Sequence, residues 1–188
     1  GNFTEVAAAG AITLSTAGAA DLSDAILVTT STFNLNAGGN TLNLTGLSNT
    51  GYTVIGGAAA DTILGGDSAD FLTGAGGIDT LTGGGGLDQF RFNAVVGAND
   101  TITDFSGDTA FSGGSGDGDT LVFLALQTGV FNYVGAAAFQ NNGNSQARFA
   151  AANTLEVDTN GDGVLDITLT LTGFTAATQL TNADFSWT

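Results

Sequence analysis

The sequence predicts an all-β chain built as a solenoid of short strands, and three observations support this. Four nine-residue units follow one another from residue 56 to residue 91, reading GGAAADTIL, GGDSADFLT, GAGGIDTLT and GGGGLDQFR. Every unit begins with glycine, carries aspartate at its sixth position and has a large apolar residue at its eighth. Short alternating segments that are typical of β-strands lie on both sides of the units.

Each unit is predicted to form a turn followed by a very short strand. Glycine at the first positions lets the chain turn sharply at positive φ, which is costly for a residue with a Cβ. In the last three residues the middle side chain points inward and its neighbours point outward, as the period of two requires. The inward residues are Ile63, Leu72, Leu81 and Phe90. Two units therefore complete one flattened coil.

The aspartates at the sixth position are expected to stack at the two edges of the coils. Because alternate turns share an edge, Asp61 should lie against Asp79, and Asp70 against Asp88. Stacked carboxylates repel one another unless a cation lies between them. Carboxylate and peptide carbonyl oxygens suit Ca²⁺, and the chain has no His or Cys for zinc, copper or iron. A glycine-rich linker that merely carries acids would not keep this strict period.

The four units resemble the nonapeptide G-G-x-G-x-D-x-U-x of RTX proteins, the hemolysin-type calcium-binding proteins of Gram-negative bacteria. The resemblance implies a right-handed parallel β-roll with calcium in its turns and export by type I secretion. Loops 56–61 and 74–79 would frame one ion, and loops 65–70 and 83–88 another. Asp67 is either an additional ligand or a solvated turn residue. The implied ligand residues are Gly56, Ala58, Asp61, Gly65, Asp67, Asp70, Gly74, Gly76, Asp79, Gly83, Gly85 and Asp88.

Three units depart from the family pattern, which is expected to weaken calcium binding in those turns. Ala59 and Ser68 stand at position four, and Ala75 at position two, where the family prefers glycine. Continuing the nine-residue frame backward places Tyr52 where the aspartate would be. Residues 1–55 are therefore expected to form ion-poor coils of the same solenoid, or a small N-terminal cap.

Acidic motifs continue after the strict repeat ends at Arg91. The segments NDTITDF at 99–105 and GDGDTLVF at 116–123 resemble the segment that closes the β-roll in serralysin-type proteases. Asp100, Asp104 and Asp119 are candidate calcium ligands there, or ordinary turn-capping carboxylates. The calcium-binding roll with its closing segment is thus expected to span residues 56–123.

Residues 124–188 are predicted to form a β-sandwich-like cap. The strand candidates in and next to it are TLVFLAL, GVFNYVG, SQARFA, NTLEVDT and LDITLTLTGF. The segment DTNGDGVLD at 158–166 places Asp158, Asn160, Asp162 and Asp166 at positions 1, 3, 5 and 9 of an EF-hand-like loop, without the Glu of position 12. It is either a further calcium site or a hairpin turn held by Asx side chains. The final NADFSWT resembles an uncleaved type I export signal, or is a last edge strand.

The charge balance restricts the partners. The 188 residues carry 18 acids and only two cations, giving a net charge of −16. This argues against nucleic acid and anionic membranes, and for a cation as partner. Without bound ions, repulsion among carboxylates should oppose folding. No cysteine is present for a disulfide, no stretch reads as a transmembrane span, and the first residues lack the features of a cleavable signal peptide.

Catalysis is not expected, because the chain has no His, Cys or Lys and no G-x-S-x-G motif. The sequence favours a secreted calcium-binding structural protein: a surface-layer, adhesin or filament subunit that folds and forms homo-oligomers or polymers on binding calcium outside the cell. The alternative is the C-terminal folding and type I secretion module of a larger protease, lipase or adhesin. Ice binding, suggested by flat Thr-rich faces on some RTX coils, is disfavoured because outward positions mix Thr with Leu, Phe, Gln and Arg.

Overall fold

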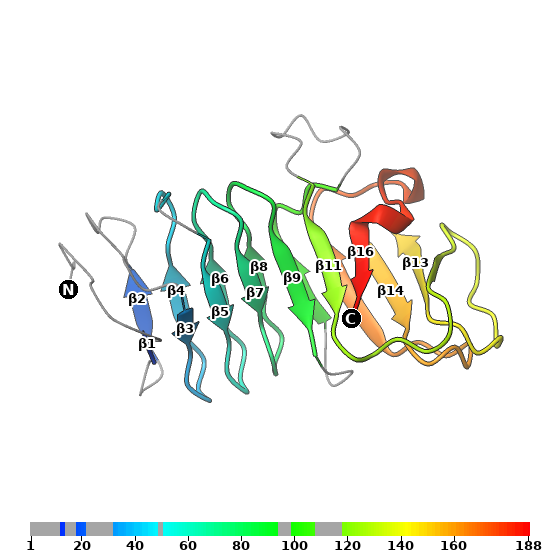
Figure 1. The fold of residues 1–188 in the computed structure, drawn as a ribbon, viewed down its shortest axis with the longest axis horizontal. Coiled ribbons are helices and arrows are strands. Elements are labelled where there is room, and N and C mark those ends of the chain that lie inside the picture. Colours follow the sequence, from blue (N-terminus) through cyan, green and yellow to red (C-terminus); the bar gives the residue numbers. More distant parts are fainter. Residues whose placement is uncertain (1–11, 14–17, 22–31, 49–50, 94–98, 108–117) are drawn as a thin grey trace.

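A computed structural model describes residues 12–13, 18–21, 32–48, 51–93, 99–107 and 118–188, and these residues form an all-β structure with two sheets (Figure 1). The gaps cover much of the region expected to hold N-terminal coils. In the described part of the chain, no helix is long and apolar enough to cross a membrane. The only helices there are two 3-10 turns, η1 (Ala177–Gln179) and η2 (Asn182–Asp184).

The first sheet has seven strands, all parallel to their neighbours. Its order is β1 (Ile12–Thr13), β3 (Thr32–Asn34), β5 (Thr53–Ile55), β7 (Phe71–Thr73), β9 (Gln89–Phe92), β11 (Thr120–Phe123) and β16 (Phe185–Trp187).

The second sheet has nine strands and is mixed. Its order is β12 (Asn132–Tyr133), β13 (Gln146–Ala151), β14 (Thr154–Asp158), β15 (Ile167–Leu171), β10 (Asn99–Ile102), β8 (Thr80–Thr82), β6 (Thr62–Leu64), β4 (Thr41–Asn43) and β2 (Ala19–Asp21). Only the pairs β13–β14 and β14–β15 are antiparallel.

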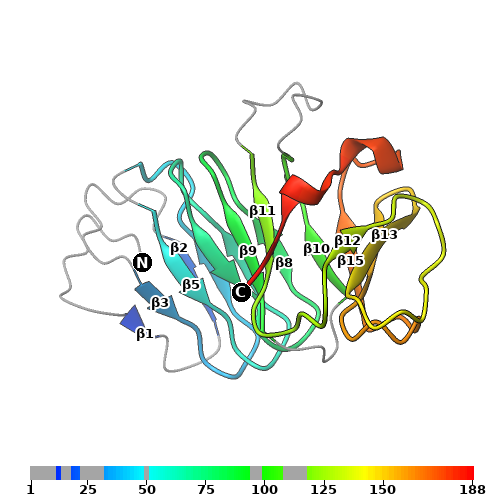
Figure 2. The same ribbon diagram turned by 45° about the vertical axis from the view of Figure 1, so that its right-hand side comes forward.

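From β1 to β11 successive strands alternate between the two sheets, so that each pair of strands makes one circuit of the chain (Figure 2). Turns therefore gather at two edges, where one sheet passes to the other. This is the alternation that the nine-residue period predicts. It also explains the parallel pairing, because strands two apart in sequence become neighbours running in the same direction.

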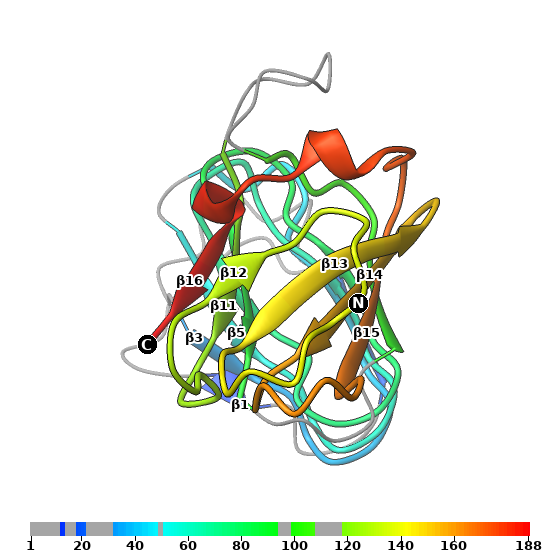
Figure 3. The same ribbon diagram turned by 90° about the vertical axis from the view of Figure 1, so that its right-hand side faces the viewer.

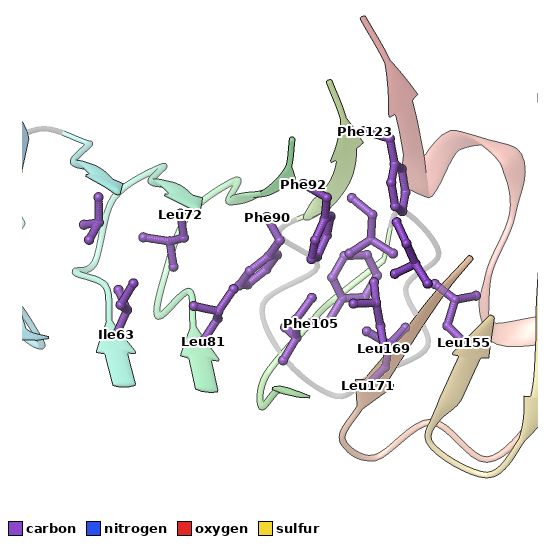
Figure 4. Packing of buried hydrophobic residues seen from close by; sticks show 14 of the residues in the cluster. Ile63, Leu72, Leu81, Phe90, Phe92, Phe105, Phe123, Leu155, Leu169 and Leu171 are labelled. Atoms are coloured by element: carbon purple, nitrogen blue, oxygen red, sulfur yellow. The ribbon is translucent and has the colours of Figure 1, made fainter. Parts of the chain in front are cut away.

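The core lies between the sheets and consists of the inward side chains of these short strands. The four apolar residues at position eight, Ile63, Leu72, Leu81 and Phe90, are fully buried, as predicted (Figure 4). The alternating apolar residues before the repeats are buried as well: Phe33, Leu35, Leu42, Leu44 and Leu47. Inward side chains from both sheets thus form one hydrophobic core that runs along the molecule.

The C-terminal strands extend the same two sheets. β15 pairs with β10 in the second sheet, and β16 pairs with β11 in the first. All five predicted strand segments contain a strand, and β13, β14 and β15 lie together at this end (Figure 3). Segment 158–166 joins two antiparallel strands, so it is a hairpin connection. Trp187 stacks on Phe123 with ring centroids 4.5 Å apart and closes the core there.

The two outward faces differ in composition. Six threonines lie in register on adjacent strands of the second sheet, in the order Thr41, Thr62, Thr80, Thr101, Thr170 and Thr154. Phe71, Gln89 and Arg91 instead lie on β7 and β9 of the first sheet. The Phe, Gln and Arg residues that the sequence mixes with Thr at outward positions therefore lie on the first sheet. The six threonines in register on the second sheet form a Thr ladder.

Candidate metal-binding turns

The sixth-position residues stack in two columns, one at each edge. The first column contains Asn40, Asp61, Asp79 and Asp100, and the second contains Tyr52, Asp70, Asp88 and Asp119. In both columns each residue's backbone N–H donates to the carboxylate Oδ1 of the next, at 2.7, 2.7 and 2.8 Å in the first and 2.7, 2.8 and 3.0 Å in the second.

The columns confirm the expected stacking of Asp61 with Asp79 and of Asp70 with Asp88. They also place Tyr52 where the reading frame predicts and bring two candidates beyond the repeat, Asp100 and Asp119, into line. Asn40 was not predicted as a member, because it precedes Asp61 by 21 residues, whereas the step within the repeats is 18.

Glycine at position one of each turn is required by the carboxylate behind it. A Cβ built on Gly56 would lie 2.8 Å from Oδ2 of Asp61, and one on Gly65 would lie 2.5 Å from Oδ2 of Asp70. Gly74 and Gly83 meet their own aspartates even more closely. The turn therefore wraps tightly around its carboxylate, and a side chain at position one has no room.

Successive turns at one edge also bring their peptide carbonyls together. The carbonyl oxygen of Gly74 lies against Gly56, and that of Gly83 against Gly65. At position three, a Cβ built on Gly76 would lie 3.4 Å from the Ala58 carbonyl oxygen. The position-three residues Asp67 and Gly85 stack in the same way. The predicted ligand residues of each turn pair are thus adjacent in space.

The four turns have two different conformations. In the turns at 74–79 and 83–88, positions two and four lie in the left-handed region, with φ of 71° and 115° at Ala75 and Gly77 and of 97° and 112° at Gly84 and Gly86. No residue of the turns at 56–61 and 65–70 does so. Ala59 and Ser68 stand at position four in the latter, where a Cβ disfavours positive φ. The two turns in which Ala59 and Ser68 replace glycine thus have a different backbone conformation. Ala75 also replaces a glycine, but it keeps the left-handed conformation.

This difference decides which carboxylate oxygens are satisfied. In the first two turns the position-two amides of Gly57 and Gly66 donate to Oδ2 of Asp61 and Asp70, both at 2.7 Å. In the turn at 83–88 the amide of Gly84 donates instead to Oδ2 of Asp104, at 2.9 Å. Oδ2 of Asp79 is buried and has no hydrogen-bond partner.

Burial raises the pKa of several of these carboxyls. Desolvation raises the pKa of Asp70 to about 6, with a smaller contribution from the charge of Asp67. It raises the pKa of Asp79 to about 6, assisted by Asp100 and Asp61. Asp88 reaches about 8, because desolvation is reinforced by the neighbouring acids, Asp119 first. Desolvation likewise raises the pKa of Asp119 to about 6 and that of Asp100.

No arginine compensates these columns, and the chain has no lysine. The guanidinium of Arg91 lies over the ring of Phe71, 3.9 Å from its centroid, and Arg148 pairs with Glu156 at 2.6 Å. Within the described residues, no group of three or more Asp or Glu side chains is placed to hold a metal ion. A cation in the columns would therefore take peptide carbonyls together with carboxylates.

The other candidate side-chain ligands lie apart from the two columns. Asp67 and Asp104 are exposed, and Asp104 accepts from the amides of Gly83 and Gly84. In the hairpin, Asp158 is buried and accepts from Gly161 at 2.7 Å and Gly163 at 2.9 Å.

The remaining hairpin candidates also accept local amides. Asn160 accepts from Asp162, Asp162 accepts from Val164, and Asp166 accepts from Thr159. The bonds to Asn160 and Asp162 are the Asx bonds expected of a hairpin turn, the bond to Asp166 crosses the hairpin, and calcium binding at residues 158–166 stays a prediction.

Comparison with known proteins adds no assignment. No family model matches the chain. No curated protein matches its sequence either.

Proposed function

We propose that the chain is a calcium-binding protein of the RTX type, a β-roll whose turns bind Ca²⁺, and that the ions drive its folding. The observation that carries this proposal is Oδ2 of Asp79, a buried carboxylate oxygen without a hydrogen-bond partner. It lies in a column of buried acids that no arginine approaches. A buried anion without a partner is strongly unfavourable unless a cation or a proton neutralises it.

The donor set fits calcium. Asp61 and Asp79 with carbonyls of Gly56, Ala58, Gly74 and Gly76 would hold one ion. Asp70 and Asp88 with those of Gly65, Asp67, Gly83 and Gly85 would hold another. All these donors are oxygens on closely stacked turns, and hard cations with flexible coordination prefer such ligands. When bound, calcium would neutralise carboxylates that otherwise repel one another.

The energy is sufficient for a folding switch. Extracellular calcium modules bind at roughly 10⁻⁴ to 10⁻³ M. Each site at about tenfold excess of ion over its dissociation constant adds about 1.4 kcal/mol. The two sites named above would add about 3 kcal/mol, and occupied sites at Asp100, Asp119 and residues 158–166 would bring the sum to roughly 7 kcal/mol, comparable with the stability of an ordinary domain at about 5 to 15 kcal/mol. Folding would then follow export into a calcium-rich medium.

The test is a calcium titration of metal-stripped protein at pH 7.5, followed by far-ultraviolet circular dichroism. We expect the metal-free chain to be only partly folded at this pH and millimolar calcium to complete its β-structure, and we expect Asp79→Ala to need several-fold more calcium than the parent chain. Glu156→Gln, which removes a carboxylate outside the columns, should leave the midpoint nearly unchanged. Full β-structure in the metal-free parent chain, unaltered by calcium, would refute the proposal.

We further propose a secreted structural role, in which calcium-folded chains assemble at or outside the cell surface. The outward positions of β4, β6, β8 and β10 support this, because they carry Thr, Asn and Leu and no charged side chain. In a chain of net charge −16, such a face can approach another copy without strong repulsion. Light scattering that shows only monomers in millimolar calcium would reject assembly. It would then favour the alternative, a type I secretion module of a larger protein.

The Thr ladder favours a second candidate function, the binding of ice. Its hydroxyls repeat about every 4.8 Å across the sheet, and threonine side chains are stiff at χ1. Such a regular, uncharged array can hold water in a fixed arrangement. Thermal hysteresis measured on the calcium-loaded chain tests this: Thr80→Tyr should abolish it, whereas Thr53→Tyr on the first sheet should not. Absence of hysteresis in the parent chain would remove this candidate.

A further inference from the structure

Asn40 occupies the first described place in the first column. Its backbone N–H donates to Oδ1 of Asp61 at 2.7 Å, just as the N–H of Asp61 donates to Asp79. The strand that follows it, β4, pairs with β6 in the same register in which β6 pairs with β8. The turn that ends at Asn40 is therefore equivalent to the aspartate turns, with an amide in place of the carboxylate.

The side-chain amide of Asn40 is directed into a cluster of oxygens. Nδ2 donates to Oδ1 of Asp61 at 3.0 Å, to the carbonyl of Asn36 at 3.1 Å and to the carbonyl of Gly38. Nδ2 of Asn36 donates to Oδ1 of Asn40 at 3.1 Å, which fixes the orientation of the amide. The side chain is buried, with 4% of its surface exposed. One carboxylate oxygen and two peptide carbonyls thus surround a nitrogen that bears partial positive charge.

The next level of the column lacks such a group. Both oxygens of Asp61 are satisfied, by Asn40 and by the amide of Gly57. Oδ2 of Asp79 has no partner. A carboxylate oxygen without a positive partner therefore lies between Asp61 and Asp79. Between Asn40 and Asp61 the amide of Asn40 already supplies that partner.

We propose that the Asn40 amide stands in for a calcium ion, so that the ion sites at this edge start beyond Asp61 and the coil around β4 packs without calcium. This inference rests on the proposed calcium function of the turns. Asn40 would then mark the N-terminal limit of the calcium sites in the first column. It also provides a calcium-independent coil next to which the calcium-dependent turns can order.

The structure predicts the effect of Asn40→Asp. The substitution removes the two side-chain N–H donors. The new carboxylate at position 40 then faces the carbonyls of Asn36 and Gly38 and lies beside the carboxylate of Asp61. This oxygen cluster is then neutralised by an additional calcium ion. Asn132→Asp is a matched control, since it adds the same charge at an exposed position on β12.

The experiment counts bound calcium per 188-residue chain by equilibrium dialysis at pH 7.5, with urea denaturation in metal-free and saturating calcium buffers. We expect Asn40→Asp to bind one ion more than the parent, to be less stable without calcium and to regain stability with it. Asn132→Asp should match the parent in ion count. An unchanged count for Asn40→Asp, or a variant that stays unfolded in saturating calcium, overturns the inference. A parent chain that binds no calcium instead overturns the proposed function.

Discussion

The stability of the calcium-free chain should fall as the pH rises from about 4 to about 8. Asp70, Asp79 and Asp119 have pKa values raised from 3.8 to about 6 by burial, and Asp88 to about 8. The folded chain therefore holds protons that the unfolded chain has already released. Stability from these protons is fully present below the unfolded pKa and is lost as the pH rises through the folded values.

Asp88 dominates the change between pH 6 and pH 8. The three carboxyls with pKa values of about 6 are already half ionised at pH 6, whereas Asp88 keeps its proton up to about pH 8. One proton bound only by the folded chain changes the free energy of unfolding by about 1.4 kcal/mol per pH unit. Asp88 alone should thus remove about 2 to 3 kcal/mol over these two units. That is a large part of an ordinary stability.

Urea denaturation of metal-stripped protein at half-unit steps of pH measures this slope. In Asp88→Asn the neutral amide can still accept from the Asp70 N–H, so the free energy of unfolding should fall by only about 1 kcal/mol from pH 6 to pH 8, through the three carboxyls with pKa values of about 6. Asp162→Asn, a change at an exposed hairpin residue, should keep the slope of the parent. In saturating calcium the free energy of unfolding should be nearly independent of pH in this range, because the ion keeps the same carboxylates ionised in the folded chain and they are already ionised in the unfolded chain.

A calcium-free stability that rises between pH 6 and pH 8 would refute this reasoning. So would an Asp88→Asn variant with the slope of the parent chain. Either result would mean that the buried carboxyls are ionised in the calcium-free fold and are stabilised by something other than protons.

Two further predictions concern packing. Leu81→Ala should lower the free energy of unfolding in calcium by about 2 to 5 kcal/mol, because the side chain is fully buried. Leu87→Ala, at a site 61% exposed, should change the free energy of unfolding by less than about 0.5 kcal/mol. Equal losses in the two variants would contradict the assigned core. Gly65→Ala should cost about 1 to 3 kcal/mol, since its methyl group meets the Gly83 carbonyl of the stacked turn and the Asp70 carboxylate. Gly18→Ala, with open space around it, should be tolerated, and thermal denaturation compares the pair.

The repeating part of the fold could be predicted because a strict nine-residue period fixes which residues turn and which side chains point inward. A nine-residue step with one apolar residue per strand leaves only one face for the core, and Ile63 and Leu72 are buried accordingly. The stacking of Asp61 on Asp79 follows from the same step. Asn40 lies 21 residues before Asp61 and Asp119 lies 31 residues after Asp88, whereas the step within the repeats is 18. Their places in the columns could therefore not be predicted from the period.

The turn conformations were only partly predictable. Position four is glycine where the left-handed conformation occurs, at Gly77 and Gly86, and alanine or serine where it does not. Ala75 adopts φ of 71° against its local preference, as the only residue other than glycine with positive φ in the described repeat turns. Local propensity could not indicate this.

The sequence by itself determined the alternation of turn and strand, the inward row of apolar residues and the stacking of the repeat aspartates, because all three follow from a strict short period. Only the tertiary structure decided which oxygens of those aspartates are satisfied. A column carboxylate can accept both from an amide of its own turn and from an amide of a turn about 20 residues away, and the backbone conformation of each turn directs those amides toward it or away. That is why Asp61 is fully hydrogen-bonded and Asp79, in an equivalent place, keeps a buried oxygen without a partner.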